Sequence, residues 1–436
     1  MKAKRVLALV LCAAMVLPSE SLSVYAMAGG VDVVTEETNE VTPEAQGETV
    51  VSDMEESASD EIEDAAASDE AESSGEKEEA EVSETANEEL ILPEEESEAV
   101  AAEFYSESSP FLTVDEDGTL QMVEGQKLSG TTVTIPKEAK KIPKGIFNDV
   151  ISVRNIRFAA DSELTEIEAG AFEGSGITEI ELPAGVTELQ NEVFKNSELK
   201  KVTFLGEVTS IGDMTFSDTK LEKIDAPYVV SVGSSAFENC SDLTEVRMPR
   251  LKIIGTRAFR YCTGLQSGMV WNTGLESIGN EAFKGSGFIE LNLTVLTRED
   301  LSIGAKAFEG CTSLRKVSLP KQLPALSTGI FKGCISLADV KFDEYAATER
   351  VGEEAFSGCK ALDSIALPAS VKVIDVNAFG GCEGLDTITI NNPSPDGDDF
   401  SIAQNAFPSR SKSSAVMEGY GGKVREYAES RGYIYR

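Results

Sequence analysis

The chain has few side chains of the kinds that carry out catalysis. Its 436 residues include no histidine, which excludes Ser-His-Asp and Cys-His catalytic arrangements and every histidine metal ligand. The sequence has no Gly-rich phosphate loop at a strand–helix junction and no nucleophile elbow. Paired carboxylates occur throughout so acidic a chain and carry little information. We therefore expect no catalytic residue, no cofactor and no enzymatic activity.

Two acidic loops contain residue types that could bind calcium. They are Asp115-Glu116-Asp117 and Asp396-Gly397-Asp398-Asp399. Neither completes the ligand order of an EF-hand, which needs a third ligand before the glycine and a late glutamate. We interpret both as solvated loops and expect no metal site.

Six cysteines share one spacing. Each lies three residues after a phenylalanine, and they are Cys240, Cys262, Cys311, Cys334, Cys359 and Cys382. In other copies the same position holds Ser175, Ser197, Thr219 or Ser286. A position that accepts Cys, Ser or Thr indicates a small buried turn site, so we favour free thiols.

A disulfide framework is the alternative if the protein is exported, because neighbouring repeats lie within bridging distance. The pairs that this distance allows are Cys240–Cys262, Cys311–Cys334 and Cys359–Cys382. Side chains in one repeat position point the same way, however, and parallel side chains make poor bridges. A zinc site is less favoured still, since no C-x-x-C pair exists.

The cysteines belong to a repeat that fills the second part of the chain. A phenylalanine recurs every 21 to 28 residues, at Phe147, Phe172, Phe194, Phe216, Phe237, Phe259, Phe283, Phe308, Phe331, Phe356, Phe379 and Phe407. Each has an aliphatic residue five positions earlier, namely Ile142, Ile167, Leu189, Ile211, Val232, Ile254, Ile278, Ile303, Leu326, Val351, Ile374 and Ile402. Glycine often follows the aliphatic residue, which suits a tight turn.

A second block follows each phenylalanine and reads A-F-x-x-C-x-x-L-x-x-I-x-L-P in its clearest copies, Ala307–Pro320 and Ala355–Pro368. The I-x-L part alternates as a short, half-buried strand must, and proline ends that strand. One unit is too small to close a core. Stacked units would bury the phenylalanine and the aliphatic residues in one continuous column.

This pattern resembles the BspA-like leucine-rich repeats of secreted and surface proteins, over residues 130–436. The resemblance implies an α/β repeat solenoid, a right-handed superhelix with one parallel β-sheet on its concave side. It also implies adhesion or recognition rather than catalysis. Leu112–Leu120 reads as a hairpin cap around Asp117-Gly118, and Thr132–Pro136 as a half repeat. Gly419–Gly432 is similar to the family's short terminal helix, and Tyr433 to Tyr435 would be a closing strand.

Charge divides the chain into three parts. Residues 1–28 carry a net charge of +2, residues 31–103 carry −27 and residues 104–436 carry −13. Such an acidic balance argues against nucleic acid and anionic membranes as partners. The predicted segments are a signal peptide (1–28), an acidic disordered spacer (29–103), an N-terminal cap with a half repeat (104–146), the repeat array (147–407) and a C-terminal cap (408–436).

The N-terminus has the order of a secretory signal. A basic start and the apolar run Val6–Leu17 precede small residues, which predicts cleavage after Ala26 or Ala28. The apolar run is too short for a membrane anchor, and Leu11 before Cys12 disfavours a lipoprotein. We expect a secreted or cell-surface protein without a transmembrane span.

The acidic segment has a composition typical of a solvated spacer. Alternatives are cation buffering, a docking tail for a basic partner, and docking of Leu90–Pro93 on the folded part.

The predicted ligand face follows from the alternation of the I-x-L strands. Residues before and after the isoleucine would point outward on the concave sheet. From these we select Glu179, Glu181, Lys201, Lys223, Glu245 and Arg247 as candidate ligand-binding residues. An ordinary solvated sheet remains an alternative, because the face lacks aromatic anchors.

One repeat departs from the pattern, with Gly268 where isoleucine belongs and Trp271, the chain's only tryptophan, where proline usually sits. Trp271 could pack against a neighbouring turn or, with Tyr261, form an exposed anchor.

Three functions are open. The first is an exported module that binds an extracellular protein or glycan, as a monomer. The second is a structural, envelope-associated protein without a specific ligand. The third, an enzyme, is disfavoured because repeats and caps occupy almost all of residues 104–436.

Overall fold

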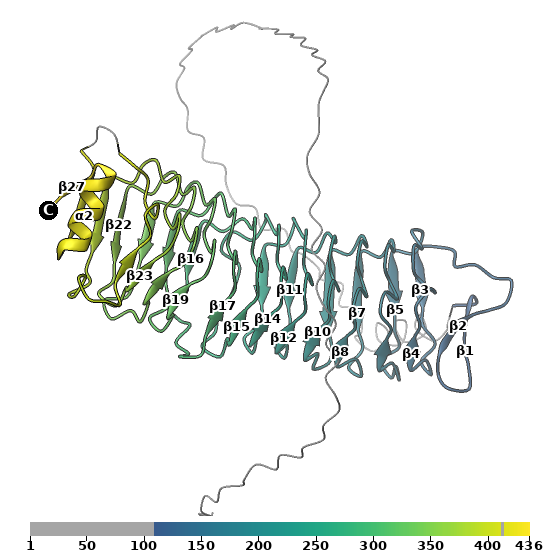
Figure 1. Ribbon diagram of the computed structural model, residues 1–436. Helices are drawn as coiled ribbons and strands as arrows, with labels where there is room; N and C mark the ends of the chain where they lie inside the picture. Colours follow the sequence, from purple (N-terminus) through teal and green to yellow (C-terminus); the bar gives the residue numbers. More distant parts are fainter. Residues whose placement is uncertain (1–108, 411–413) are drawn as a thin grey trace, which may run out of the picture. The chain divides into compact units, whose positions relative to one another are not determined.

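The computed structural model describes residues 109–410 and 414–436, which form a solenoid of stacked parallel strands with little helix (Figure 1). The predicted signal peptide, the acidic segment and residues 104–108 of the predicted cap lie outside the described residues. Each turn of the solenoid has three sides: a longer strand, a strand of two residues, and a turn around the repeated phenylalanine.

The longer strands carry the I-x-L pattern and form what we call the long-strand face. They pair in parallel in three groups: β3 (Thr132–Thr134), β5 (Asn155–Arg157), β7 (Glu179–Leu182), β9 (Lys201–Phe204), β11 (Lys223–Asp225) and β13 (Glu245–Arg247); β16 (Glu290–Asn292), β18 (Lys316–Ser318) and β20 (Asp339–Lys341); β22 (Ser364–Leu367), β24 (Thr387–Ile390), β26 (Val416–Gly419) and β27 (Ile434–Tyr435). In β11, Ile224 is buried between exposed Lys223 and Asp225. The predicted alternation is confirmed.

A second parallel ladder, which the resemblance did not imply, forms the short-strand face. Its strands are β4 (Lys141–Ile142) and β6 (Glu166–Ile167); β8 (Glu188–Leu189), β10 (Ser210–Ile211), β12 (Ser231–Val232), β14 (Ile253–Ile254), β15 (Ser277–Ile278) and β17 (Ser302–Ile303); β19 (Ala325–Leu326), β21 (Arg350–Val351), β23 (Val373–Ile374) and β25 (Ser401–Ile402). The second residue of every strand is the aliphatic residue five positions before the phenylalanine. This spacing therefore marks a buried strand position.

The twelve repeat phenylalanines form one stacked column. Successive ring centroids lie 4.7 to 5.6 Å apart, within the range that favours aromatic contact. All twelve side chains are buried. The column runs through every turn of the array and joins the aliphatic residues of both ladders in one core.

The third side is held by hydrogen bonds that run from each turn to the next. Around Phe216, Met214 and Asp218 have left-handed backbone, with φ of 54° and 59°. This geometry directs the N–H of Phe216 at Ala236 O of the following turn, 2.8 Å away. The N–H of Asp218 likewise donates to Glu238 O at 2.8 Å. The backbone of neighbouring turns is thus hydrogen-bonded on all three sides, which satisfies buried polar groups.

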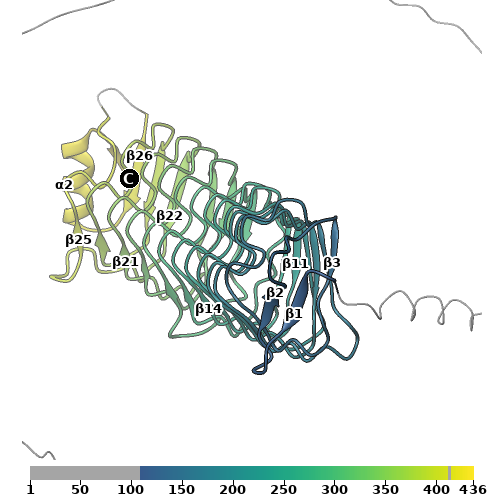
Figure 2. The same cartoon turned by 90° about the vertical axis from the view of Figure 1, so that its right-hand side faces the viewer.

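The first turn is covered by a hairpin, as expected. The antiparallel strands β1 (Leu112–Val114) and β2 (Leu120–Met122) are joined by a turn in which Gly118 has a φ of 83° (Figure 2). The N–H of Lys140 donates to Gly118 O at 2.8 Å, which ties the hairpin to β4. Leu120 is fully buried, so the hairpin covers the apolar end of the array.

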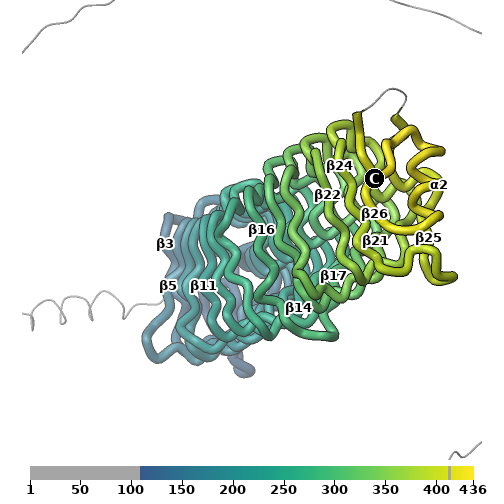
Figure 3. Tube along the Cα trace, turned by 90° about the vertical axis from the view of Figure 1, so that its left-hand side faces the viewer, coloured from purple at the N-terminus to yellow at the C-terminus, as the bar shows by residue number. Residues whose placement is uncertain are grey.

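The last turn is covered by helix α2 (Gly422–Arg431), also as expected (Figure 3). In the turns from Phe172 to Phe379 the phenylalanine N–H donates to the following phenylalanine turn, and none follows Phe407 within the described residues. The N–H of Phe407 donates instead to the Tyr427 hydroxyl of the helix at 3.1 Å. The two rings meet edge to face at 6.0 Å, so Tyr427 ends both the hydrogen-bond series and the aromatic column.

Candidate binding face

Six of the eight predicted site residues lie together on the long-strand face. All six are exposed, and they alternate with buried residues of the same strands: Glu179, Glu181, Lys201, Lys223, Glu245 and Arg247. The parallel pairing places Glu179 beside Lys201, Lys201 beside Lys223, and Lys223 beside Glu245. The strands thus hold the six side chains in neighbouring rows at the strand spacing of about 4.8 Å.

The rows differ in whether their charged side chains form ion pairs. Lys223 Nζ lies 3.1 Å from a Glu245 carboxylate oxygen, and Arg247 donates to Asp225 at 2.9 Å. These exposed pairs neutralise β11 and β13 against each other and contribute little to stability. Among the described residues, no ion pair involves Glu179, Glu181 or Lys201. Charge is therefore available for a partner over β7 and β9.

A hollow of about 340 Å³ lies over these strands. Its lining is Asn155, Ile156, Arg157, Glu179, Ile180, Glu181, Lys201 and Thr203. The hollow was not predicted, since its shape depends on side chains from three strands that are 22 to 24 residues apart in the sequence. Its lining is polar and mixed in charge, which suits hydrogen bonds and ion pairs to a ligand rather than apolar contact.

The position of Trp271 differs from the sequence prediction by one residue. The long-strand ladder pairs Val246 with Met269, so Met269 takes the isoleucine position that had been assigned to Gly268. Trp271 then takes the inward leucine position instead of the proline position. Its ring is half buried and lies 5.6 Å from the ring of Phe283 and 6.4 Å from that of Phe288. Of its two interpretations, packing against the neighbouring turn describes these contacts.

Tyr261 lies away from the long-strand face, on the side of the phenylalanine turns. It is two residues after Phe259 and has left-handed backbone, with φ of 60°. The guanidinium of Arg260 lies 4.6 Å from the centre of its ring, and Arg260 also pairs with Glu238 at 3.0 Å. Tyr261 and Trp271 thus occupy different sides of their turns and do not form one anchor.

In each of the two acidic loops, an aspartate accepts hydrogen bonds from backbone N–H groups. Asp115 accepts the N–H groups of Asp117 and Thr119 at 3.0 and 2.8 Å, closing the hairpin turn, and these bonds help lower its pKa. Asp396 accepts the N–H of Lys423 at 2.9 Å in the first turn of α2. The backbone N–H groups of Lys423 and Gly422 hold the pKa of Asp396 below its ordinary value. Asp396 therefore caps a helix that lies 27 residues further along the chain.

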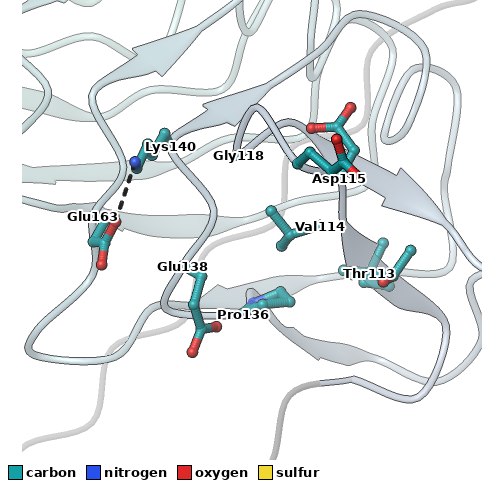
Figure 4. Close-up of a pocket in the computed structure, with 10 residues that line it drawn as sticks. Thr113, Val114, Asp115, Gly118, Pro136, Glu138, Lys140 and Glu163 are labelled. Carbon is teal, nitrogen blue, oxygen red and sulfur yellow. Dashed lines mark ion pairs between the residues drawn. The ribbon is translucent and has the colours of Figure 1, made fainter.

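A second hollow, of about 480 Å³, lies between the cap hairpin and the first turn of the array (Figure 4). Val114 and Pro136 lie between the hairpin and the turn, and Lys140 pairs with Glu163 at 3.8 Å on one side. Glu138 is a further lining residue. The sequence pattern could not predict this hollow, because it lies between the hairpin and the first turn, and the repeat does not specify how these two elements meet.

The six cysteines are buried, and none forms a disulfide, as predicted. Each thiol donates to the carbonyl oxygen of the phenylalanine in the preceding turn, over 3.0 to 3.3 Å. Ser286 makes the same bond to Phe259 O at 2.7 Å. Ser197 and Thr219 donate instead to the phenylalanine carbonyl of their own turn, at 2.6 and 2.8 Å, and the buried Ser175 hydroxyl has no hydrogen-bond partner among the described residues. The shared position therefore takes a small side chain, which in most turns donates to a phenylalanine carbonyl.

These thiols make the stability of the fold sensitive to alkaline pH. Burial raises the pKa of Cys240 and of Cys311 from an ordinary value of 9.0 to about 12. Above pH 9 the thiols of the unfolded chain lose their protons while the buried thiols keep theirs, which favours unfolding. The free energy of unfolding therefore falls as the pH rises from 9 toward 12, by about 1.4 kcal/mol per thiol and pH unit. The C240S/C311S variant should lose stability less steeply between pH 8 and 10.5 in urea unfolding. Equal slopes for variant and native protein would contradict this account.

In residues 109–410 and 414–436, no group of three or more Cys, Asp and Glu side chains is arranged to hold a metal ion. Within the same residues, no helix combines the length and the apolar character of a membrane span.

A solenoid whose turns each contribute one buried phenylalanine and one I-x-L strand to a common core is a leucine-rich repeat protein. A family model described as the BspA type leucine rich repeat region, in six copies, matches residues 126–244, 187–300, 230–345 and 276–414. These matches span more than half of the sequence. The chain belongs to the BspA type leucine-rich repeat family.

Solved structures similar to this chain include three bacterial proteins. The pneumococcal vaccine antigen PcpA is 22% identical over 74% of this chain and 81% of its own, with a TM-score of 0.45. A leucine-rich repeat protein from Bacteroides ovatus is 21% identical over 69% and 99%, with a TM-score of 0.41. A leucine rich cell surface protein from Faecalibacterium prausnitzii is 21% identical over 64% and 92%, with a TM-score of 0.36. A comparison with curated proteins found no match.

Proposed function

We propose that this protein is an exported recognition module that binds a protein or glycan outside the bacterial cell, as a monomer. Proteins of the BspA type are typically secreted or surface-located, and their repeats are generally binding scaffolds rather than enzymes. The predicted signal peptide with cleavage after Ala26 or Ala28 supports export. In this proposal residues 29–103 are a spacer, residues 104–146 and 408–436 are caps, and residues 147–407 present the binding surface.

The observation that carries the proposal is the charged part of the long-strand face. Strands β5 to β13 present ten outward side chains in two columns. Nine of them are charged or carry an amide, and Thr203 completes the set: Asn155, Arg157, Glu179, Glu181, Lys201, Lys223, Asp225, Glu245 and Arg247.

 The uncharged members of this set are Asn155 and Thr203, so both signs of charge are interspersed with hydrogen-bonding groups. Two strand ladders and the hydrogen-bonded phenylalanine turns hold these side chains on a rigid frame, which favours their use in recognition.

A structural role without a specific ligand is the second candidate. One feature of the long-strand face supports it: none of the outward positions from Asn155 to Arg247 is aromatic, and aromatic side chains dominate most binding hot spots. Beyond β18 the outward side chains include Ser364, Ala366 and Thr387, which are small and neutral. An ordinary solvated sheet would have this composition.

Capture of binding partners by the full chain would decide between the two candidates. The immobilised protein would be exposed to extracellular matrix proteins and to a set of glycans. The D225R/R247D variant exchanges the two members of one ion pair, which moves charge on the long-strand face while a pair can still form. The matched control, R350D/D375R, exchanges an ion pair of 2.6 Å at β21.

We expect capture by the native chain and by the control, and at least threefold weaker capture by D225R/R247D. No capture by the native chain from either set would favour the structural role. Equal capture by all three proteins would place the binding site elsewhere on the molecule. A hydrolase activity that persists through repurification would contradict the proposed absence of catalysis.

A further inference from the structure

The strand β7 presents two carboxylates at alternate positions. Glu179 and Glu181 are exposed on the long-strand face, and Ile180 between them is buried. Residues two apart on a strand are separated by about 6.6 Å along the chain. An extended peptide repeats the side chains on one of its sides with the same spacing. A peptide lying along β7 could therefore place every second side chain over one of the two carboxylates.

Both carboxylates are available for such a contact. Among the described residues, neither has an ion-pair partner, although Glu179 is aligned with Lys201 on the next strand. Glu181 is aligned with Thr203, which carries no charge. By contrast, Asp225 on β11 is neutralised by Arg247 at 2.9 Å. The two carboxylates of β7 thus lie between Arg157 on β5 and Lys201 on β9 in the lining of the 340 Å³ hollow, without an ion pair to either among the described residues.

The other charges around the hollow restrict the orientation of a partner. Lys201 is aligned with Lys223 on the next strand, and like charges directly opposite each other on neighbouring strands are unfavourable. An acidic group placed beside Lys201 would relieve this repulsion. Arg157 on β5 lines the opposite side of the same hollow. The hollow therefore suits a chain with basic residues over β7 and acidic or polar residues toward β5 and β9.

We infer that the partner recognised by the long-strand face is a polypeptide in extended conformation with Lys or Arg at alternate positions, bound across Glu179 and Glu181. This inference rests on the proposed function and names the partner class of the same face. The charge and the spacing of the two carboxylates select this polypeptide, since the outward positions of β5 to β13 carry no aromatic ring. A neutral glycan would use neither feature.

The test compares three labelled peptides that have the same Thr- and Val-rich host sequence. The first contains Lys-Thr-Lys, the second Lys-Thr-Thr-Lys and the third Ser-Thr-Ser. In an extended peptide, only the first places both lysines on one side. The two lysine peptides have equal charge, so the general attraction of a chain with a net charge of −38 acts on both alike. Their difference in affinity for the full chain therefore isolates the spacing.

We expect Lys-Thr-Lys to bind about threefold more tightly than Lys-Thr-Thr-Lys in low salt, and the preference to shrink in 0.5 M salt. The E179Q/E181Q variant should lose the preference. The matched control E290Q removes one exposed carboxylate at the same position of β16 and should keep it. Both variants change only exposed side chains, so far-ultraviolet circular dichroism should match that of the native chain.

Equal affinity for the two lysine peptides would overturn the inference, as would an unchanged preference in E179Q/E181Q. Capture of a neutral glycan at this face would also overturn it and would leave the proposed function in place. The proposed function fails separately, when the native chain captures neither a protein nor a glycan.

Discussion

Replacing Phe308 with alanine should lower the free energy of unfolding by about 3–5 kcal/mol. Phe308 is fully buried and stacks between Phe283 and Phe331, with centroid distances of 5.4 and 5.6 Å. Removing the ring breaks the column at two contacts and leaves a cavity that the hydrogen-bonded turns on either side cannot easily close. Urea unfolding followed by circular dichroism and by the fluorescence of Trp271 measures the change.

Tyr345 provides the matched control for this prediction. It is 70% exposed, and its ring contacts Lys321 Nζ at 5.4 Å from the centroid. Tyr345→Ala removes a similar number of atoms without opening the core, so its effect should stay within about 1 kcal/mol. Similar losses for the two variants would mean that the phenylalanine column does not dominate the stability of the array.

Replacing Gly268 with alanine should destabilise the centre of the array by about 2–3 kcal/mol. A Cβ atom at this position would lie 1.8 Å from Thr244 O and 2.8 Å from the carbonyl carbon of the same residue. Both atoms belong to the backbone, so the clash can be relieved only by moving the two turns apart. Trp271 lies three residues away and is the chain's only tryptophan, so its fluorescence reports this local change.

Gly422→Ala is the control for the glycine prediction. A Cβ atom at Gly422 would meet only Asp396 Oδ1, at an ordinary contact distance of 3.6 Å. Alanine favours the helical conformation over glycine, so this variant should be as stable as the native protein or slightly more stable. If Gly268→Ala unfolds at the same urea concentration as Gly422→Ala, the close contact with Thr244 does not constrain the fold.

The repeat itself could be predicted from the sequence, because each of its positions has one physical role that recurs in every turn. The phenylalanine column, the buried residues of the I-x-L strands and the donor position of the cysteines all follow from residue type and spacing. The aliphatic residue five positions before each phenylalanine was equally regular. Its two-residue strand was missed, because two residues are too few to show an alternating pattern.

Irregular and long-range features could not be predicted from single repeats. In the turn of Trp271, the inward Met269 lies seven positions after Cys262, whereas Val246 lies six positions after Cys240. That one extra residue shifts Trp271 from the proline position, just after the strand, to the inward leucine position of the strand. The capping of α2 by Asp396 depends on a contact across 27 residues, which no local motif indicates.

The net charge of −38 says little about the proposed binding face, because most of it lies in residues 31–103. Residues 31–103 account for −27 of it, and residues 104–436 carry −13 with both signs interspersed. On the long-strand face the charges of β11 and β13 cancel in pairs, and unpaired negative charge lies on β7. The proposed specificity therefore depends on two carboxylates at a fixed spacing rather than on the acidity of the whole chain.

Photo-crosslinking from the two faces of the solenoid tests the proposed binding surface most directly. A photoreactive amino acid would replace Thr203 on the long-strand face or Ser231 on the short-strand face, both of which are partly exposed. Each full-length variant would be irradiated with the captured partner. We predict a crosslink from position 203 and none from position 231. A crosslink from position 231 alone would contradict the assignment of binding to the long-strand face.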